Sequence, residues 1–348
     1  MRTLEWVPSS AALQMIDQRI LPERLELVTY TTYQEVAEAI RIMVIRGAPA
    51  IGAAGAFGMA MAGFQSSAQD GEAFLKDMET AYQVLNASRP TAVNLKWGLD
   101  QMMSLVKLHQ GSIHDLRNAL LAKAQQIADE DVEINKKIAA FGAELIDDGD
   151  TLIHHCNTGA LATVDWGTAL GVIRLAFEQG KKIHVLVDET RPRLQGARLT
   201  AWELQQYGIP FDIISDNAAG YFLRSGQVQK VFFGADRVAS NGDVANKVGS
   251  YMLALAAYDN SVPVYSVFPS STVDLTLSSG DEIPIEEREG DEVLDIQIKG
   301  ERATPRGATA RNPAFDVTPN RLLSGLVTEK GIIRPPFHLH LPETLKGA

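Results

Sequence analysis

The sequence predicts an α/β protein with a mainly helical N-terminal domain followed by a Rossmann-like parallel-sheet C-terminal domain. Up to about residue 147 the chain is dominated by helical spacing and helix-favouring composition. After that point, short apolar runs alternate with amphipathic stretches. Strands that alternate with helices form parallel sheets with right-handed crossovers. We therefore expect one domain at residues 1–147 and a second at 148–348.

The first half is expected to hold a small strand cap and five helical segments. The run LELVTY at 25–30 favours a strand. Ser112 has the position of an N-cap for the longest segment, which we expect in two parts, 113–128 and 131–145. The expected helical segments are 34–45, 50–63, 71–86, 91–110 and 113–146.

The second half shows the alternation of an open parallel sheet. Gly180 and Gly208 stand where helix C-caps belong. An acidic, loop-rich tail follows Val273 and ends in a helix-like segment at 317–327. The expected strands are 151–156, 182–189, 210–215, 228–236 and 262–269. The expected helices between them are 164–179, 197–207, 218–224 and 245–258.

Composition limits the class of protein and its partners. A formal net charge of -11 argues against a protein that coats nucleic acid or an anionic membrane, but it allows a small anionic substrate if basic residues gather locally. The single cysteine, Cys156, excludes an intramolecular disulfide and suits a reducing compartment. The N-terminus lacks the pattern of a secretory signal, and the apolar window 48–64 is short for a bilayer span. We expect a cytoplasmic protein with no nucleic-acid or membrane partner.

Chemically capable residues follow several of the expected strands. In an open parallel sheet, ligands bind outside the carboxyl ends of the strands. Cys156 follows the first strand, Gln195 comes after the second, and Asp236 ends the fourth, with Asn246 and Lys247 opening the next helix. A lone cysteine is more often a buried structural residue, and a lone aspartate is more often a cap. Their common edge nevertheless predicts one site.

The character of the two reactive candidates depends on their neighbours. Cys156 precedes an expected helix start, where a negative charge is stabilised. Asp236 follows the apolar run Val231–Phe233, and apolar surroundings favour a protonated carboxyl. The two residues are therefore candidates for a thiolate and a general acid.

The local positive charge that an anionic substrate needs is also present. Arg46, Gly47 and Ala48 precede an apolar helix, where small residues let backbone amides approach an anion. Arg89 stands before another expected helix. The alternative for both arginines is a structural role in capping helix carbonyls.

Cofactor and metal motifs are missing from the sequence. No Walker loop or G-x-G-x-x-G is present, and the glycines between 52 and 63 favour close helix packing over phosphate binding. His154 and His155 are adjacent in a strand, so they point to opposite faces and cannot form a metal pair. We assign no cofactor and no metal.

Several sequence blocks together carry a resemblance that runs over nearly the whole chain. They are RGAPAIGAAGAFGMAMA (46–62), SRPTAVNLKWGLD (88–100), LIHHCNTGALAT (152–163), DETRPRLQGARLTAWEL (188–204), GADRVASNGDVANKVGSY (234–251), NPAFDVTP (312–319) and TEKGIIRPPF (328–337). In this order the blocks closely resemble the methylthioribose-1-phosphate isomerase family. The broader superfamily includes ribose-1,5-bisphosphate isomerases and the regulatory alpha, beta and delta subunits of the translation-initiation exchange factor.

The resemblance implies roles for the candidate residues. Asp236 matches the family's proton donor and Cys156 its catalytic cysteine. It implies a homodimer and the conversion of 5-methylthioribose 1-phosphate, a small anionic sugar phosphate, to 5-methylthioribulose 1-phosphate in methionine salvage. The substrate-binding residues that it implies are Arg46, Gly47, Ala48, Arg89, Gln195, Asn246 and Lys247.

Alternatives stay open at this point. The substrate of an isomerase on this fold is alternatively 5-deoxyribose 1-phosphate or ribose 1,5-bisphosphate. A non-catalytic regulatory subunit on the same fold is a further alternative, although Cys156 and Asp236 are both retained. The hydrogen moves from C2 to C1 either as a proton, with Cys156 as base, or as a hydride.

Overall fold

The computed structural model describes residues 1–90 and 92–346 and divides into two compact units. The first unit comprises Met1–Lys136 and Thr158–Gly167, and the second comprises Lys137–Asn157 and Thr168–Ala348. Each unit is described by itself below.

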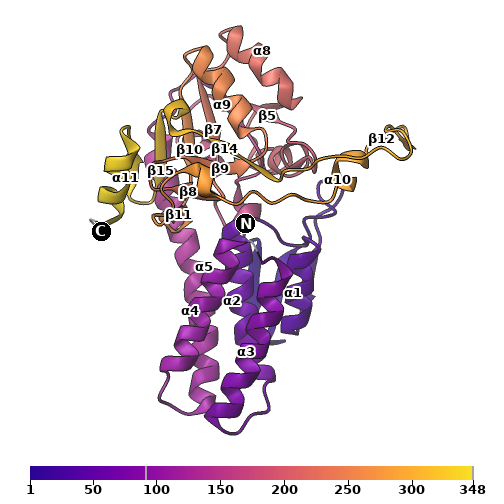
Figure 1. The fold of residues 1–348 in the computed structure, drawn as a ribbon, viewed down its shortest axis with the longest axis vertical. Helices are drawn as coiled ribbons and strands as arrows, with labels where there is room; N and C mark the ends of the chain where they lie inside the picture. The colour runs from indigo at the N-terminus through magenta and orange to yellow at the C-terminus, as the bar shows by residue number, and fades with distance from the viewer. Residues whose placement is uncertain (91, 347–348) are drawn as a thin grey trace. The chain divides into compact units, whose positions relative to one another are not determined.

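The first unit combines a small antiparallel sheet with a bundle of helices (Figure 1). The expected strand at 25–30 is confirmed as β3 (Leu27–Tyr30), and it pairs with β2 (Ala12–Ile16), which pairs with β1 (Leu4–Val7). All five expected helical segments are present. They are α1 (Tyr33–Arg41), α2 (Ala48–Gln65), α3 (Gly71–Ser88), α4 (Val93–Leu108) and α5 (Ile113–Ala143).

Helix α2 is buried along most of its length, and its glycines serve close packing as expected. A Cβ on Gly52 would lie 2.8 Å from the carbonyl oxygen of Asn94 in α4. Ser112 caps α5 by accepting the amide of Asp115, and α5 is one continuous helix rather than two segments. Thr91, where the fourth helix was expected to begin, lies outside the described residues.

The second unit is built on a seven-stranded sheet, which confirms the expected Rossmann-like layer. The strand order is β16-β15-β10-β7-β4-β5-β6, and every neighbouring pair is parallel except β15–β16. The chain starts at β4 in the middle, moves outward through β5 and β6, and returns to β7 on the other side of β4. A crevice for ligands forms where the order reverses in this way. The strands are β4 (Thr151–His154), β5 (His184–Asp188), β6 (Phe211–Ile214), β7 (Lys230–Phe233), β10 (Val264–Val267), β15 (Gly325–Thr328) and β16 (Gly331–Ile333).

Helices and short irregular helical turns follow the strands of this sheet. Gly208 is a left-handed C-cap, as expected. Gly180 also has a positive φ, just after the end of its helix. The elements are α6 (Ala169–Glu178), the short π-helix η2 (Gly196–Thr200), α7 (Ala201–Tyr207), η3 (Asp216–Ala218), α8 (Ala219–Arg224), α9 (Ser250–Asp259), α10 (Asp291–Leu294) and α11 (Phe337–Lys346).

A second sheet, which the sequence did not predict, corrects two expectations. Its strands, in the order β11-β8-β9-β14, are Val273–Asp274, Arg237–Ala239, Val244–Lys247 and Phe315–Thr318. Residues 245–247 were expected to open a helix, but they pair with β14, and α9 begins only after Gly249 at φ 107°. The expected helix at 317–327 is also wrong, because both ends of that segment lie in strands.

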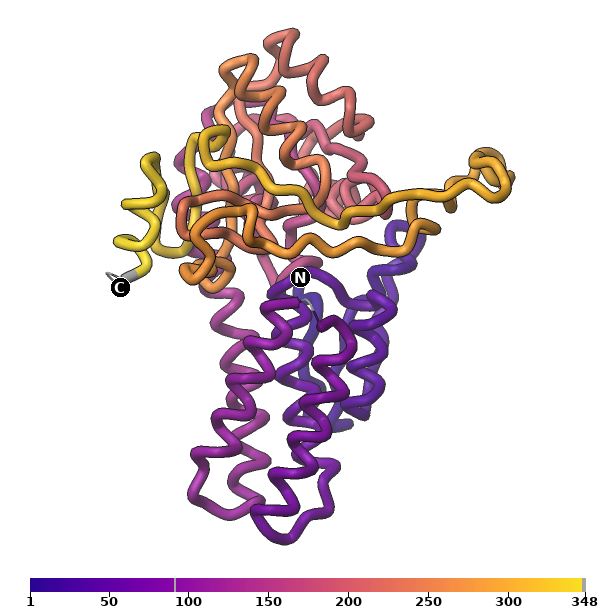
Figure 2. Tube along the Cα trace, viewed as in Figure 1, coloured from indigo at the N-terminus to yellow at the C-terminus, as the bar shows by residue number. Residues whose placement is uncertain are grey.

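The acidic tail forms a long excursion from the second unit. Figure 2 shows its two branches running together to the hairpin of β12 (Gln297–Ile298) and β13 (Glu301–Arg302). Backbone hydrogen bonds such as Arg288 N to Asn312 O, at 2.9 Å, join the branches. Among the described residues, none of the helices has the length and apolar character that a membrane crossing requires.

Candidate active site

Two predicted site residues follow the neighbouring strands β4 and β7, where the strand order reverses. Cys156 comes two residues after β4, and Asp236 comes three residues after β7. The register continues past the strands, since the amide of His155 donates to Phe232 O at 3.3 Å. Both predicted reactive groups thus come from the expected edge of the sheet.

Cys156 is buried and held in an unusual backbone conformation. Its φ is 68°, in the left-handed region that side chains with a Cβ rarely adopt. Its amide donates to Thr190 Oγ1 at 2.9 Å, and its carbonyl oxygen accepts from Thr200 Oγ1 at 2.7 Å. Such a conformation costs about 1–3 kcal/mol and persists only where the surroundings enforce it. Two threonine hydroxyls supply that constraint.

Thr190 is itself held by a carboxylate. Its φ is 62°, and its hydroxyl donates to the carbonyl oxygen of Asp188 at 3.0 Å. Asp216 accepts the amides of Thr190 and Arg191 with its two oxygens, at 2.6 and 2.7 Å. The ends of β4, β5 and β6 are therefore joined by hydrogen bonds that converge near Cys156.

The residue that follows Cys156 is held in place by a buried carboxylate. Asn157 donates from Nδ2 to Glu203 Oε1 at 2.8 Å and to Thr200 Oγ1 at 3.2 Å. Thr200 and Glu203 are fully buried. The start of α7 is thereby attached to the segment that carries the thiol.

Asp236 lies between the two sheets of the second unit. Its amide donates to the carbonyl oxygen of Ala245 in β9 at 2.9 Å, and its side chain is half-buried. Ala245 is followed in β9 by Asn246 and Lys247. The backbone of Asp236 is therefore hydrogen-bonded to the strand that carries the predicted binding pair.

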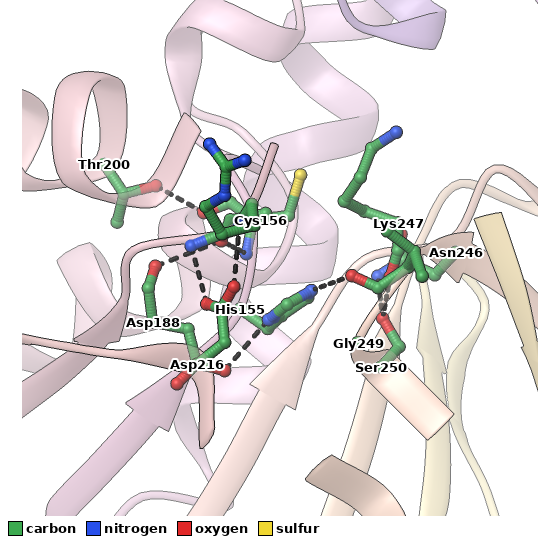
Figure 3. Close-up of polar contacts among 12 residues, drawn as sticks. His155, Cys156, Asp188, Thr200, Asp216, Asn246, Lys247, Gly249 and Ser250 are labelled. Carbon is green, nitrogen blue, oxygen red and sulfur yellow. Dashed lines mark hydrogen bonds and ion pairs between the residues drawn. The ribbon is translucent and has the colours of Figure 1, made fainter. Parts of the chain in front are cut away.

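Asn246 and Lys247 are buried and firmly positioned. Asn246 Nδ2 donates to Ser250 Oγ at 2.8 Å, and that hydroxyl donates to Lys247 O at 2.8 Å. The Lys247 ammonium donates to Ala314 O at 2.6 Å. Figure 3 shows this ammonium and the Cys156 thiol pointing to the same side, away from the ring of His155.

Gln195 offers a polar atom for a ligand. It is only 7% exposed, and its Oε1 has no hydrogen-bond partner among the described residues. The next residue, Gly196, packs so closely that a Cβ there would lie 1.7 Å from Asp188 O and 3.0 Å from Thr190 Oγ1. Gln195 is thus joined to the strand ends that hold Cys156. A buried amide oxygen without a partner suits a hydroxyl donor.

His155 and Asp188 form a buried pair beneath these groups. His155 Nδ1 lies 2.9 Å from Asp188 Oδ2, and His155 Nε2 lies 3.1 Å from Val248 O. With Asp216 they offer ligand atoms within 4.8 Å of one another, a spacing that could admit a metal ion. Asp216 already accepts two amides and His155 already has a partner at each nitrogen, so we interpret the trio as parts of a hydrogen-bonded network in which Thr190 connects Asp216 to Asp188.

The remaining predicted residues belong to the first unit. Gly47 is the N-cap of α2 with φ 96°, and a Cβ there would lie 2.3 Å from Ala162 O. Arg46 Nε donates to Gln18 Oε1 at 3.2 Å, and Ala48 begins the helix. Arg89 ends α3 and is half-buried.

Sequence reasoning missed the residues that hold these groups in place. Thr190, Thr200 and Asp188 lie in the quoted block 188–204, but hydroxyl and carboxylate partners have no periodic signal. His155 is also absent from the predicted site, although its position beside the cysteine at a strand end is a signal for a site residue.

Comparison with known proteins gives two kinds of match. The sequence model of the Initiation factor 2 subunit family matches residues 44–335. Methylthioribose-1-phosphate isomerase 2 of Pseudothermotoga lettingae is 50% identical over 347 residues, covering 100% of this chain and 99% of the relative. Methylthioribose-1-phosphate isomerase of Thermosipho africanus is 51% identical over 339 residues, covering 97% and 96%.

Two solved structures resemble the whole chain. The 5-methylthioribose 1-phosphate isomerase from Pyrococcus horikoshii has a TM-score of 0.93 and 43% identity, covering 100% of this chain and 96% of that chain. The translation initiation factor eIF-2B subunit delta from A. fulgidus has a TM-score of 0.88 and 40% identity, covering 99% of each chain.

Proposed function

Because the chain belongs to the methylthioribose-1-phosphate isomerases within the Initiation factor 2 subunit family, we propose that it converts 5-methylthioribose 1-phosphate to 5-methylthioribulose 1-phosphate in methionine salvage. The observation that carries this proposal is the placement of Cys156 and Asp236 after the neighbouring strands β4 and β7. The buried Oε1 of Gln195, which has no hydrogen-bond partner among the described residues, supports a ligand that offers a hydroxyl donor.

Asp236 acts as the general acid in this proposal. The anomeric oxygen of the substrate carries phosphate, so no free aldehyde opens spontaneously. The bond between C1 and the ring oxygen must break, and the departing oxygen needs a proton. Asp236 donates that proton, and the electron pair of the broken bond stays on the ring oxygen.

The hydrogen at C2 must then move to C1, and two routes are open. In the first, Cys156 removes a proton from C2, the enediol-like intermediate is protonated at C1, and the C2 hydroxyl loses its proton to give the ketone. In the second, a hydride passes from C2 to C1 while the C2 hydroxyl loses its proton. In both routes C2 is oxidised and C1 reduced within one molecule, so no external electron acceptor is needed. Substantial solvent deuterium at C1 after turnover in deuterium oxide would exclude a pure hydride shift.

We assign substrate binding to the remaining predicted residues. Arg46, Arg89 and Lys247 bind the phosphate as cations, and Gln195 and Asn246 bind sugar hydroxyls. Gly47 and Ala48 offer backbone amides at the start of α2. In this assignment the helical N-terminal domain contributes phosphate-binding residues. We also propose that the protein is a cytoplasmic homodimer. Light scattering on the purified protein tests whether it is a dimer.

The decisive experiment offers purified protein three substrates without added cofactor. They are 5-methylthioribose 1-phosphate, 5-deoxyribose 1-phosphate and ribose 1,5-bisphosphate, and ketose formation is followed by NMR. We expect the fastest turnover on the first, with some on the deoxy sugar, because a hydrophobic pocket discriminates such a change by only about 1–3 kcal/mol. Absence of turnover on all three would favour a regulatory subunit, the second candidate suggested by the eIF-2B relative.

A further inference from the structure

The pair His155 and Asp188 is a buried titratable unit that the proposed reaction does not use. The side chains are 0% and 1% exposed, and their facing atoms are 2.9 Å apart. Buried charges are costly unless they are paired, so such a pair at the carboxyl ends of β4 and β5 is expected to have a role.

The partners of the ring determine where its protons are. Val248 O is a carbonyl and can only accept, so His155 Nε2 carries a hydrogen and donates it across 3.1 Å. Nδ1 then faces an oxygen of Asp188. Either the imidazolium donates to the carboxylate, or the protonated carboxyl donates to Nδ1. In both states one proton lies between the two side chains, and the pair carries no net charge.

The surroundings support this single shared proton. Burial, together with the nearby charges of Asp216 and Glu189, raises the pKa of Asp188 to about 6 despite its hydrogen bond to the ring. Burial alone would lower the pKa of His155, but the hydrogen bond and charge of Asp188, with the charges of Asp216 and Asp316, outweigh it and raise that pKa.

The neighbouring ring behaves differently. Burial, and then the charge of His155, lowers the pKa of His154 to about 3, so His154 stays neutral. Of the two adjacent histidines at the end of β4, only His155 can therefore carry a positive charge.

His155 also joins two segments that carry proposed site residues. Its backbone precedes Cys156, and its ring is bonded to Val248, the residue after Lys247. A Cβ on Gly249 would lie 2.8 Å from His155 Cε1, so the turn leaves room for the ring only with glycine there. Asp316 fixes the same turn by accepting the amide of Gly249 at 2.7 Å.

We propose that His155 is a positioning residue, which with Asp188 and the proton shared between them fixes the Cys156 strand end relative to the turn after Asn246 and Lys247. This proposal rests on the proposed isomerase function, because it takes the thiol and the ammonium as parts of one site. Figure 3 shows the ring between the segment of Cys156 and that of Gly249.

The test replaces each side chain of the pair by an uncharged side chain of similar shape. In Asp188→Asn the amide can still donate to Nδ1, but the shared proton and its charge are removed. In His155→Gln the amide nitrogen can still reach Val248, but the bond to Asp188 is lost. We expect kcat to fall about 10²-fold in both variants with a smaller change in KM, because small misplacements of reacting groups have effects of this size.

A matched control is available at the opposite end of β5. His184 and Asp212 form a pair with the same 2.9 Å separation, but their side chains are 37% and 73% exposed. Asp212→Asn should leave kcat unchanged. Wild-type kcat in folded Asp188→Asn would overturn the proposal, whereas no turnover in the unmodified protein would overturn the proposed function first.

A second measurement is independent of activity and of variant folding. In protein with ¹⁵N-labelled histidine, we expect the ring signals of His155 to stay constant from above the pKa of Asp188, about 6, up to about pH 8, because the pair holds its one shared proton there. Signals that titrate in this range, or that shift when tightly bound metal is removed by EDTA, would overturn the shared-proton assignment.

Discussion

The hydroxyl of Thr190 lies 2.9 Å from the amide nitrogen of Cys156 and accepts its hydrogen, and both residues have positive φ. Two strained residues from neighbouring strand ends thus support each other. Thr200 completes the arrangement from α7's N-terminal side by donating to the Cys156 carbonyl. The direction of the thiol therefore depends on two hydroxyl groups that touch only its backbone.

Removing either hydroxyl should reduce turnover more than it reduces stability. Thr190→Val and Thr200→Val keep the shape but leave a buried backbone group without its partner, which costs about 1–3 kcal/mol. We expect kcat to fall tenfold or more, about 1.4 kcal/mol in activation free energy, with a small change in KM. The serine variants should restore most of the rate. Equal rates in the valine and serine variants of a folded protein would contradict the role of the hydroxyls.

Gly47 should be among the least replaceable residues of the first unit. Its φ of 96° is unfavourable for any side chain, and a Cβ would lie 2.3 Å from Ala162 O. We expect Gly47→Ala to lower the free energy of unfolding by about 2–4 kcal/mol, measured by denaturant titration.

Gly71 provides the control for that substitution. It begins α3, and no atom lies within 4 Å of a Cβ placed there. Gly71→Ala should stabilise the protein by about 0.5–1 kcal/mol, because glycine loses more conformational freedom on folding. Equal effects of the two substitutions would show that the contact with Ala162 does not matter.

The sequence predicted those parts of the fold whose signal is local. The apolar runs that became β4, β5, β6, β7 and β10 were found because buried parallel strands are continuous hydrophobic segments. Strand β9 was missed because it is an inner strand of the small sheet, between β8 and β14, and its partner β14, where Val244 faces Thr318, lies far along the chain. Such a long-range partner leaves no periodicity at residues 244–247.

The candidate site shows the same difference between features with a local sequence signal and features that depend on long-range contacts. Cys156, Gln195 and Asp236 could be located because the ends of parallel strands meet at one edge. The partners that fix them could not, because Thr190 and Thr200 reach Cys156 only after the strands are assembled. The roles of the predicted site residues in binding and catalysis stay predictions until the variants are measured.

Thr318 should be replaceable with a gain in stability. It is fully buried in β14, and its Oγ1 has no hydrogen-bond partner among the described residues. Thr318→Val removes an unsatisfied polar atom at nearly constant volume, so we expect a gain of about 1 kcal/mol and a higher Tm. Thr328 is also fully buried, but its hydroxyl accepts the amide of Lys330 at 3.1 Å. Thr328→Val should therefore lower the Tm, and a lower Tm for both variants would contradict the prediction for Thr318.

Asp131 should make the stability of the first unit depend on pH. Burial, more than the nearby charge of Asp165, raises the pKa of Asp131 to about 7, although its Oδ2 accepts the amide of Val164 at 2.7 Å. Between about pH 4 and 7 the folded protein keeps a proton that the unfolded chain releases, so stability is full below pH 4 and is lost as pH rises to 7. The loss should be a few kcal/mol at most, at about 1.36 kcal/mol per pH unit.

Asparagine at position 131 keeps an acceptor for Val164 and cannot ionise. We expect Asp131→Asn to be more stable than the unmodified protein above about pH 7 and to approach it near pH 4. Asp129 on the same helix is a control for which the opposite dependence of stability on pH is expected. Its pKa is lowered, because the hydrogen bonds from Arg2 and Gln125 outweigh burial. Asp129→Asn should therefore destabilise at neutral pH, and this difference should vanish only as pH falls below the ordinary aspartate pKa of 3.8. Denaturant titrations of the three proteins from about pH 3 to 8 measure both dependences. A stability difference between Asp131→Asn and the unmodified protein that stays constant between about pH 4 and 7 would contradict the assignment.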